Sequence, residues 1–176
     1  MEEHNREPAN PLAEFGPVGR ALFHASRTLA IFGGLMFSAL VVMSIVSIVG
    51  RKLASAPVPG DVEVLQMTAA FASASFFAYC HMMRGDVKVD FFTAKWAPRK
   101  VELLDAVGSF LVGLFGAVIA WRAAAGALSI REVGETSAIL SWPVWIAQIL
   151  MVPGFVLLAA VGFYMAAHHF RRGARA

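Results

Sequence analysis

The sequence predicts an all-α integral membrane protein with four transmembrane helices and a short amphipathic interfacial helix between the second and the third. The first observation is composition: 58% of the 176 residues are hydrophobic and 15% are charged, whereas a soluble domain carries about 25% charged residues. The second is the presence of four apolar segments, each near the roughly 20 residues that a helix needs to cross a bilayer. The third is that Lys and Arg gather in alternate connecting segments. Together these observations argue against a soluble enzyme, a coiled coil and a disordered chain.

The first two spans are predicted at residues 28–49 and 64–83. No charged residue interrupts the first, and its apolar run is longer than the core of a cleaved signal peptide. Residues 1–27 are expected to form a cytoplasmic N-terminal arm. The second span follows a turn that contains Pro and Gly, with Asp61 as the expected N-cap. Glu63 falls in the first helical turn, where negative charge suits the helix dipole.

The segment between the second and third spans predicts an interfacial helix at residues 87–97. Val89, Phe92 and Trp96 fall at helical spacing beside lysine residues, which is typical of a helix that lies on a membrane surface. Trp96 is therefore a candidate membrane anchor. A new helix is expected to start at Pro98 and to lead into the third span.

The third and fourth spans are predicted at residues 106–130 and 143–167. The transmembrane domain as a whole is expected to cover residues 28–170, followed by a short cytoplasmic tail at residues 171–176. Eleven of the fifteen Lys and Arg residues lie in the N-terminal arm, in the loop between the second and third spans, or in the tail. By the positive-inside rule, both termini are predicted to face the cytoplasm. This distribution also explains the basic pI without a nucleic-acid partner.

Aromatic and proline residues mark the fourth span. Trp142 and Trp145 flank Pro143 at its start, and indole rings tend to rest at the membrane interface. Pro153 is expected to kink the span, because a proline inside a helix leaves one backbone carbonyl without its hydrogen bond.

The predicted spans contain a single charged residue, Arg122. An ion-coupled carrier normally needs an intramembrane carboxylate or unwound polar backbone, and the spans have no Asp or Glu in their middle. We therefore expect no transport path, catalytic site, cofactor site or metal site within this chain. Arg122 has two interpretations: it snorkels toward the outer headgroups or pairs with Glu132 or Glu135, or it pairs with a residue of a partner subunit.

Two further patterns leave alternatives open. Histidines near the predicted cytoplasmic ends of spans suggest a membrane haem-anchoring subunit of a redox complex as the alternative function, although an interfacial position favours a simple polar role. Small residues recur every four positions in the second and third spans, which lets helices approach closely in lipid. They predict either packing within the chain or a seam for a second membrane protein. These two stripes are Ala70, Ala74 and Ala78, and Gly116, Ala120 and Ala124.

An ordered set of short motifs over residues 28–170 resembles the small membrane subunit, of DctQ type, of tripartite ATP-independent periplasmic (TRAP) transporters. Position 86 is usually His in that family and is Asp86 here. The motifs are, in chain order, Arg51 at the end of the first span, Glu63 at the start of the second, Arg84-Gly85-Asp86-Val87-Lys88-Val89-Asp90, Ala97-Pro98-Arg99-Lys100, Gly134-Glu135-Thr136-Ser137, Pro143-Val144-Trp145, and Pro153-Gly154.

The resemblance implies a non-enzymatic subunit of the bacterial inner membrane without a cofactor. Its implied partners are a large sodium-coupled permease subunit with many spans, a periplasmic binding protein that delivers an organic acid, and membrane lipids. The small subunit is expected to scaffold the large one and to help dock the binding protein. The residues expected to act as subunit contacts or membrane anchors are Arg51, Glu63, Arg84, Asp86, Asp90, Trp96, Arg122, Glu135, Trp142, Pro143, Trp145 and Pro153.

Overall fold

The computed structural model describes residues 15–85 and 98–174, and nearly all of them belong to four α-helices. These are α2 (Pro17–Ala54), α3 (Asp61–Met82), α4 (Pro98–Val133) and α5 (Val144–Gly173). The prediction of an all-α protein is thus confirmed. The predicted interfacial helix at residues 87–97 lies outside the described residues, as do Asp86, Asp90 and Trp96.

Each predicted span coincides with one helix, except that Met83 and Pro143 are cap residues of α3 and α5 rather than helical residues. At their other boundaries the helices extend beyond the spans. Helix α2 begins at Pro17, inside the predicted N-terminal arm, because its first turns are amphipathic and carry Arg20 and Arg27. In the described part of the chain, α2, α4 and α5 are long and apolar enough to cross a membrane. Helix α3 has the length, at 22 residues, but is not among these candidates, because Glu63, Gln66 and other polar residues along it reduce its hydropathy. The candidate spans therefore number three rather than the predicted four.

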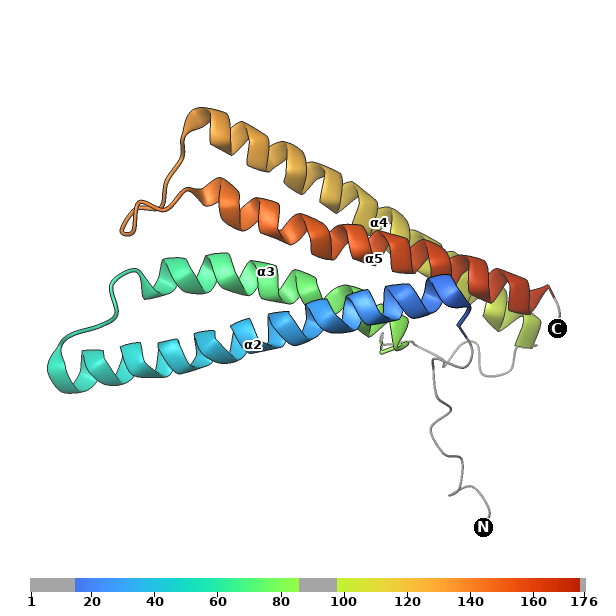
Figure 1. Cartoon of the computed structure of the whole chain (residues 1–176), viewed down its shortest axis with the longest axis horizontal. Helices are drawn as coiled ribbons and strands as arrows, with labels where there is room; N and C mark the ends of the chain where they lie inside the picture. Colours follow the sequence, from blue (N-terminus) through green and yellow to red (C-terminus); the bar gives the residue numbers. More distant parts are fainter. Residues whose placement is uncertain (1–14, 86–97, 175–176) are drawn as a thin grey trace, which may run out of the picture.

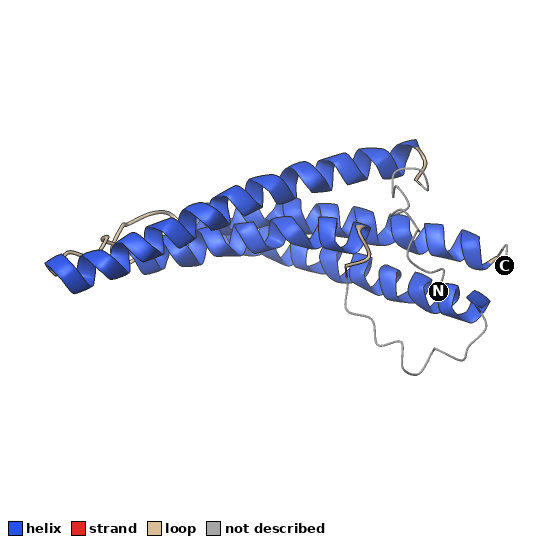
Figure 2. Ribbon diagram, turned by 90° about the horizontal axis from the view of Figure 1, so that it is seen from below, coloured by secondary structure: helices blue, strands red, loops and turns tan. Residues whose placement is uncertain are grey.

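The helices form two antiparallel hairpins, α2–α3 and α4–α5 (Figure 1). We call the end with the two connecting segments, residues 55–60 and 134–143, the loop end, and the opposite end, where α2 begins and α5 finishes, the terminus end. At the loop end the helices lie in the order α4, α5, α3, α2. The view from below shows the four described helices as long rods that run along the same direction (Figure 2).

Helix α5 holds the bundle together because it contacts each of the other three helices. Among the described residues, α4 contacts no helix except α5. The core lies along α5 and includes Val161 and Met165, which are essentially inaccessible to solvent. Much of the apolar surface of α2 and α4 remains exposed, and these faces are available to lipid or to a partner protein.

Glycine allows the closest helix crossings. A Cβ atom placed on Gly162 of α5 would lie 2.5 Å from the backbone Cα of Gly113 in α4. A Cβ atom on Gly154 of α5 would lie 2.6 Å from the backbone oxygen of Ala74 in α3. Two helix backbones therefore meet α5 at these positions, and side chains are excluded between them.

The small-residue stripes are used for packing within the chain. Ala74 and Ala78 of α3 are buried in the core, as is Ala120 of α4. A Cβ atom on Gly116 of α4 would lie 2.9 Å from the backbone nitrogen of Ala159 in α5. Of the two uses that the sequence left open, the structure shows internal packing for Ala74, Ala78, Gly116 and Ala120.

Candidate functional site

A hydrogen-bond network at the loop end ties the end of α2 to the start of α3. The carboxylate of Asp61 accepts hydrogen bonds from the hydroxyl of Ser47 and, at 3.1 Å, from the guanidinium of Arg51. The Ser47 hydroxyl in turn accepts the backbone N–H of Val58 at 3.3 Å. Asp61 was predicted as the N-cap of this helix, but the N-cap is Gly60 and Asp61 is the first helical residue. The reason is that its carboxylate bonds to α2 and to its neighbour Val62 rather than capping the helix.

Glu63 connects the two hairpins at the loop end. Its carboxylate accepts the backbone N–H of Ile139 at 2.7 Å and that of Leu140 at 3.0 Å. The side chain of Leu140 lies against Gly60, whose backbone is left-handed with φ of 70°. Glu63 thus fastens the segment between α4 and α5 onto the start of α3. This contact was missed by the sequence analysis, since a separation of 77 residues gives no local signal.

Both carboxylates lie just outside the predicted span at residues 64–83 and have lowered pKa values. The hydrogen bond from Ser47 is the main cause that lowers the pKa of Asp61, and the charge of Arg51 assists it. Desolvation raises the pKa of Glu63, but the backbone N–H donors of Leu140 and Ile139 outweigh it, so the net pKa falls below the ordinary value of 4.5. Both groups are therefore ionised at neutral pH.

The lowered pKa of Glu63 predicts how the loop end responds to acid. The pKa of Glu63 is lower in the folded protein than in the unfolded chain. Its carboxylate therefore contributes fully to stability at any pH above the unfolded pKa, and this contribution is lost as the pH falls through the folded pKa. We expect the amides of Ile139 and Leu140 to remain protected at pH 5 and to lose protection only below about pH 4.5. Hydrogen–deuterium exchange at these two amides, corrected for the intrinsic pH dependence of the exchange rate, measures this protection. Loss of protection already at pH 6 would contradict the assignment.

A groove of about 630 Å³ opens between α3 and α5 at the loop end. Its lining is unusually polar for an apolar bundle and includes Glu63, Gln66, Glu135 and Gln148. A second groove of about 350 Å³, between α2, α3 and α5, is apolar and includes Trp142 and Pro143 in its lining. The loop end therefore offers one polar and one apolar concave surface, and four of the predicted contact residues line them: Glu63, Glu135, Trp142 and Pro143.

Trp145 and Pro153, also predicted contact residues, lie further along α5. The guanidinium carbon of Arg131 lies 5.1 Å from the centre of the Trp145 ring, a cation–π contact that joins the end of α4 to the start of α5. Pro153 is exposed, and α5 is a continuous helix through it. The adjacent Gly154 makes the close crossing with α3. Trp145 and Gly154 thus make contacts within the bundle, whereas Pro153 lies on its surface.

Arg122 is exposed on α4, about two helical turns inside the end of the predicted third span. In the described residues, it makes no ion pair with Glu132, Glu135 or any other carboxylate. Neighbouring Trp121 is 74% exposed, and the outward-facing residues nearby are apolar. The structure therefore does not support the interpretation that Arg122 forms an ion pair within this chain.

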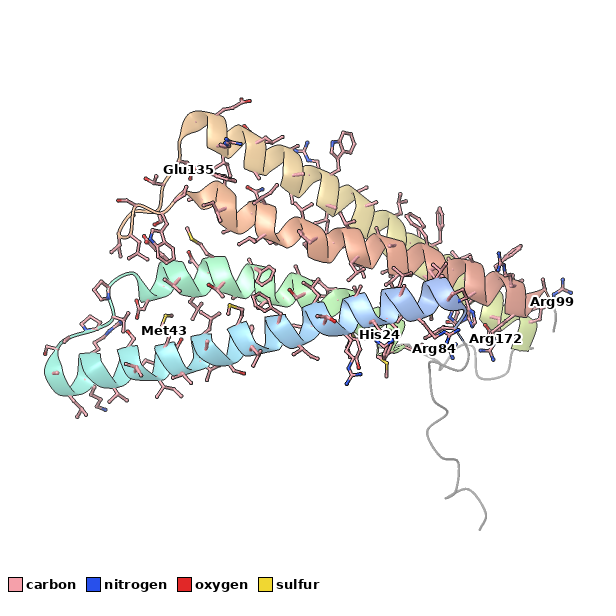
Figure 3. All side chains as sticks on the ribbon, viewed as in Figure 1. His24, Met43, Arg84, Arg99, Glu135 and Arg172 are labelled. Atoms are coloured by element: carbon pink, nitrogen blue, oxygen red, sulfur yellow. The ribbon has the colours of Figure 1, made fainter. Side chains whose placement is uncertain are left out.

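The terminus end carries a second charged cluster that the sequence analysis did not identify. His169 is buried, and its Nδ1 atom lies 2.7 Å from a carboxylate oxygen of Glu102. The same carboxylate is 3.7 Å from Nε of Arg172. Arg84, Arg99 and Arg172 all lie at this end of the molecule, with Arg84 in the turn that follows α3 (Figure 3). Arg84 is thus remote from the predicted contact residues of the loop end.

The comparison with known families agrees with the motifs of the sequence. A family model described as the DctQ component of tripartite ATP-independent periplasmic transporters matches residues 40–172. The match extends from the middle of α2 to the last turn of α5 and covers well over half of the chain. It confirms the resemblance and favours a transporter component over the haem-anchoring alternative. No curated protein and no solved structure matches the chain.

Proposed function

Because the chain belongs to the family of DctQ components of TRAP transporters, we propose that it is the fixed membrane scaffold of a sodium-driven importer of organic acids. A large permease subunit would carry the solute and ion sites, and this chain would pack beside it. The observation that carries the proposal is the exposed apolar face of α4, which carries Arg122 about two helical turns inside the end of the predicted span. Such a face suits a protein neighbour better than lipid alone, because a charged side chain facing hydrocarbon is unfavourable.

We propose that all four helices cross the inner membrane, with the terminus end in the cytoplasm. Helix α3 is antiparallel to α2 and has 22 residues, enough to cross about 30 Å of hydrocarbon. Two of its polar residues have protein neighbours: Glu63 is bound to the loop-end backbone, and Gln66 lines the groove against α5. Arg20, Arg84, Arg99 and Arg172 collect at the terminus end, which supports the cytoplasmic assignment.

The proposed mechanical role rests on rigidity. Transport by a moving domain requires a stationary counterpart, and long helices anchored at both interfaces resist displacement in the bilayer. Here glycine crossings join α4 to α5 and α3 to α5, while Glu63 and Asp61 fasten the loop end. The grooves at that end would lie on the periplasmic side, where they are placed to contact the docked binding protein.

Replacement of Arg122 tests the scaffold role. If Arg122 forms an ion pair with an acidic residue of the large subunit, Arg122→Leu leaves that residue buried and unpaired, which typically costs about 3–5 kcal/mol. We expect the amount of large subunit that co-purifies with the tagged chain in detergent to fall at least about tenfold. Solute preference of the remaining complex should not change, because the chain holds no solute site in this proposal.

The matched control is Arg99→Leu, which makes the same substitution in the first turn of the same helix. Arg99 is exposed at the terminus end, and its loss should leave co-purification unchanged. Equal recovery of the large subunit with Arg122→Leu and with the unaltered chain would mean that Arg122 snorkels to the headgroups instead.

A further inference from the structure

A cavity at the terminus end lies outside the surfaces considered so far. It has a volume of about 400 Å³ and is formed by residues 16–18 at the start of α2 and by Tyr164, His168, Arg171 and Arg172 of α5. We call it the basic cavity. Its lining combines two arginines and a tyrosine hydroxyl with the apolar side chain of Val18, which is 62% exposed.

The walls of the basic cavity are held by buried aromatic packing. Phe15 is 6% exposed, and its ring centre lies 6.0 Å from that of Tyr164 and 5.8 Å from that of His168, both edge-on. Tyr164 stacks on His168. Gly19 allows α2 to approach this stack, because a Cβ atom there would lie 2.6 Å from the ring carbon Cζ of Tyr164. The cavity is therefore a formed feature of the α2–α5 contact.

The electrostatics of the basic cavity favour an anion. Arg171 and Arg172 form the last turn of α5; Arg172 lies 3.7 Å from Glu102, whereas no carboxylate in the described part of the chain pairs with Arg171. The first turn of α2 has no acidic residue and its N-cap makes no side-chain hydrogen bond. The positive end of the helix dipole thus adds to the two guanidinium groups.

We propose that the basic cavity binds the phosphate of an anionic membrane phospholipid, with Arg171 and Arg172 as the main donors. Helix α5 carries no Asp, Glu, Lys or Arg before Arg171 and is a candidate membrane span, so its last turn lies at headgroup depth. Basic pockets between membrane helices bind acidic headgroups, and the guanidinium fork matches phosphate oxygens. Exposed Val18 offers an apolar surface to the acyl chain, which a free phosphate ion would not need.

Lipid binding by the purified complex tests this proposal. Native mass spectrometry in detergent measures the apparent affinity for phosphatidylglycerol in the unaltered protein and in the double variant Arg171→Gln/Arg172→Gln. A basic residue near a membrane surface contributes about 1 kcal/mol to the attraction of anionic lipid, so the affinity should fall at least about tenfold. Arg171→Gln alone, which keeps the contact between Arg172 and Glu102, should lower it about threefold to fivefold.

The matched control is Arg99→Gln/Lys100→Gln, which removes two charges at the same end of the bundle, in the first turn of α4. It should lower the affinity less than threefold, and phosphatidylcholine should bind at least tenfold more weakly than phosphatidylglycerol. An equal loss in both double variants would indicate diffuse surface charge and overturn the proposal. Complete displacement of phosphatidylglycerol by millimolar inorganic phosphate would assign the cavity to the free ion and overturn it as well.

Discussion

Gly162→Ala is expected to weaken the contact between α4 and α5 more than any other single methyl group added to the chain. The new Cβ atom would lie 2.5 Å from both the Cα and the backbone nitrogen of Gly113, and 3.0 Å from the backbone oxygen of Ser109. Backbone atoms cannot rotate away as a flexible side chain can, so the two helices must separate. Overpacking of this kind typically costs about 1–3 kcal/mol, and the lost contact extends along the hairpin. Unfolding of the purified protein by SDS titration, followed by circular dichroism, measures the change.

Gly108→Ala is the matched control, because Gly108 lies in α4 and a Cβ atom there would meet nothing within 4 Å. Alanine is the better helix former by about 0.5–1 kcal/mol, so this variant should be as stable as the unaltered protein or slightly more stable. If Gly162→Ala were also neutral, the close crossing of α4 on α5 would be wrong. A loss of α4–α5 contact should also lower co-purification of the large subunit, since α5 is the one described helix that α4, which carries Arg122, contacts.

Glu63→Gln should release the segment between α4 and α5 from the start of α3. The substitution preserves the size of the side chain but removes the negative charge and one of the two oxygens that accept the amides of Ile139 and Leu140. Hydrogen bonds to a charged acceptor are roughly twice as strong as neutral ones. We expect hydrogen exchange at these two amides to accelerate at least about tenfold at neutral pH, with the helices otherwise unaffected.

Glu135→Gln provides the control on the same segment. Glu135 lines the polar groove and is exposed, and the structure shows no hydrogen bond or ion pair of its side chain within the described residues. Its replacement should leave exchange at Ile139 and Leu140 unchanged. Similar acceleration in both variants would mean that overall loop charge, rather than the contact of Glu63, protects the amides. If neither variant changed exchange, the bond between the hairpins would be absent in solution.

Local sequence patterns predicted the elements well, because membrane helices are selected by composition over some twenty consecutive residues. Glu63 falls in the first turn of α3 as expected, and each predicted span matches one helix, two of them overrunning it by one residue at Met83 and Pro143. The same patterns underestimated the helix lengths. The start of α2 at Pro17 depends on Phe15, which packs against Tyr164 and His168 of α5. A contact between residues so far apart in the chain leaves no pattern in a short stretch of sequence.

The same difference between local and long-range information applies to the candidate contact residues. Their types were recognisable from the sequence, but their partners were not: Arg51 bonds to Asp61, Arg131 lies over Trp145, and Glu63 reaches a segment 77 residues away. The pair of buried His169 and half-buried Glu102, separated by 67 residues, was missed because neither residue stands in a motif. Arg122 was noticed only because a charge within an apolar run is unfavourable in lipid.

The sequence by itself determined that this protein is helical, resides in a membrane and belongs to a transporter family, because hydropathy, charge distribution and short motifs are properties of consecutive residues. Only the tertiary structure decided how the small residues are used. The close crossings of α3 and α4 with α5 use Gly113, Gly154 and Gly162. The apolar face of α4 and the grooves of the loop end take no part in these crossings. The physical reason is that close packing and hydrogen bonding depend on distances between remote backbones, and those distances are set only when all four helices have assembled.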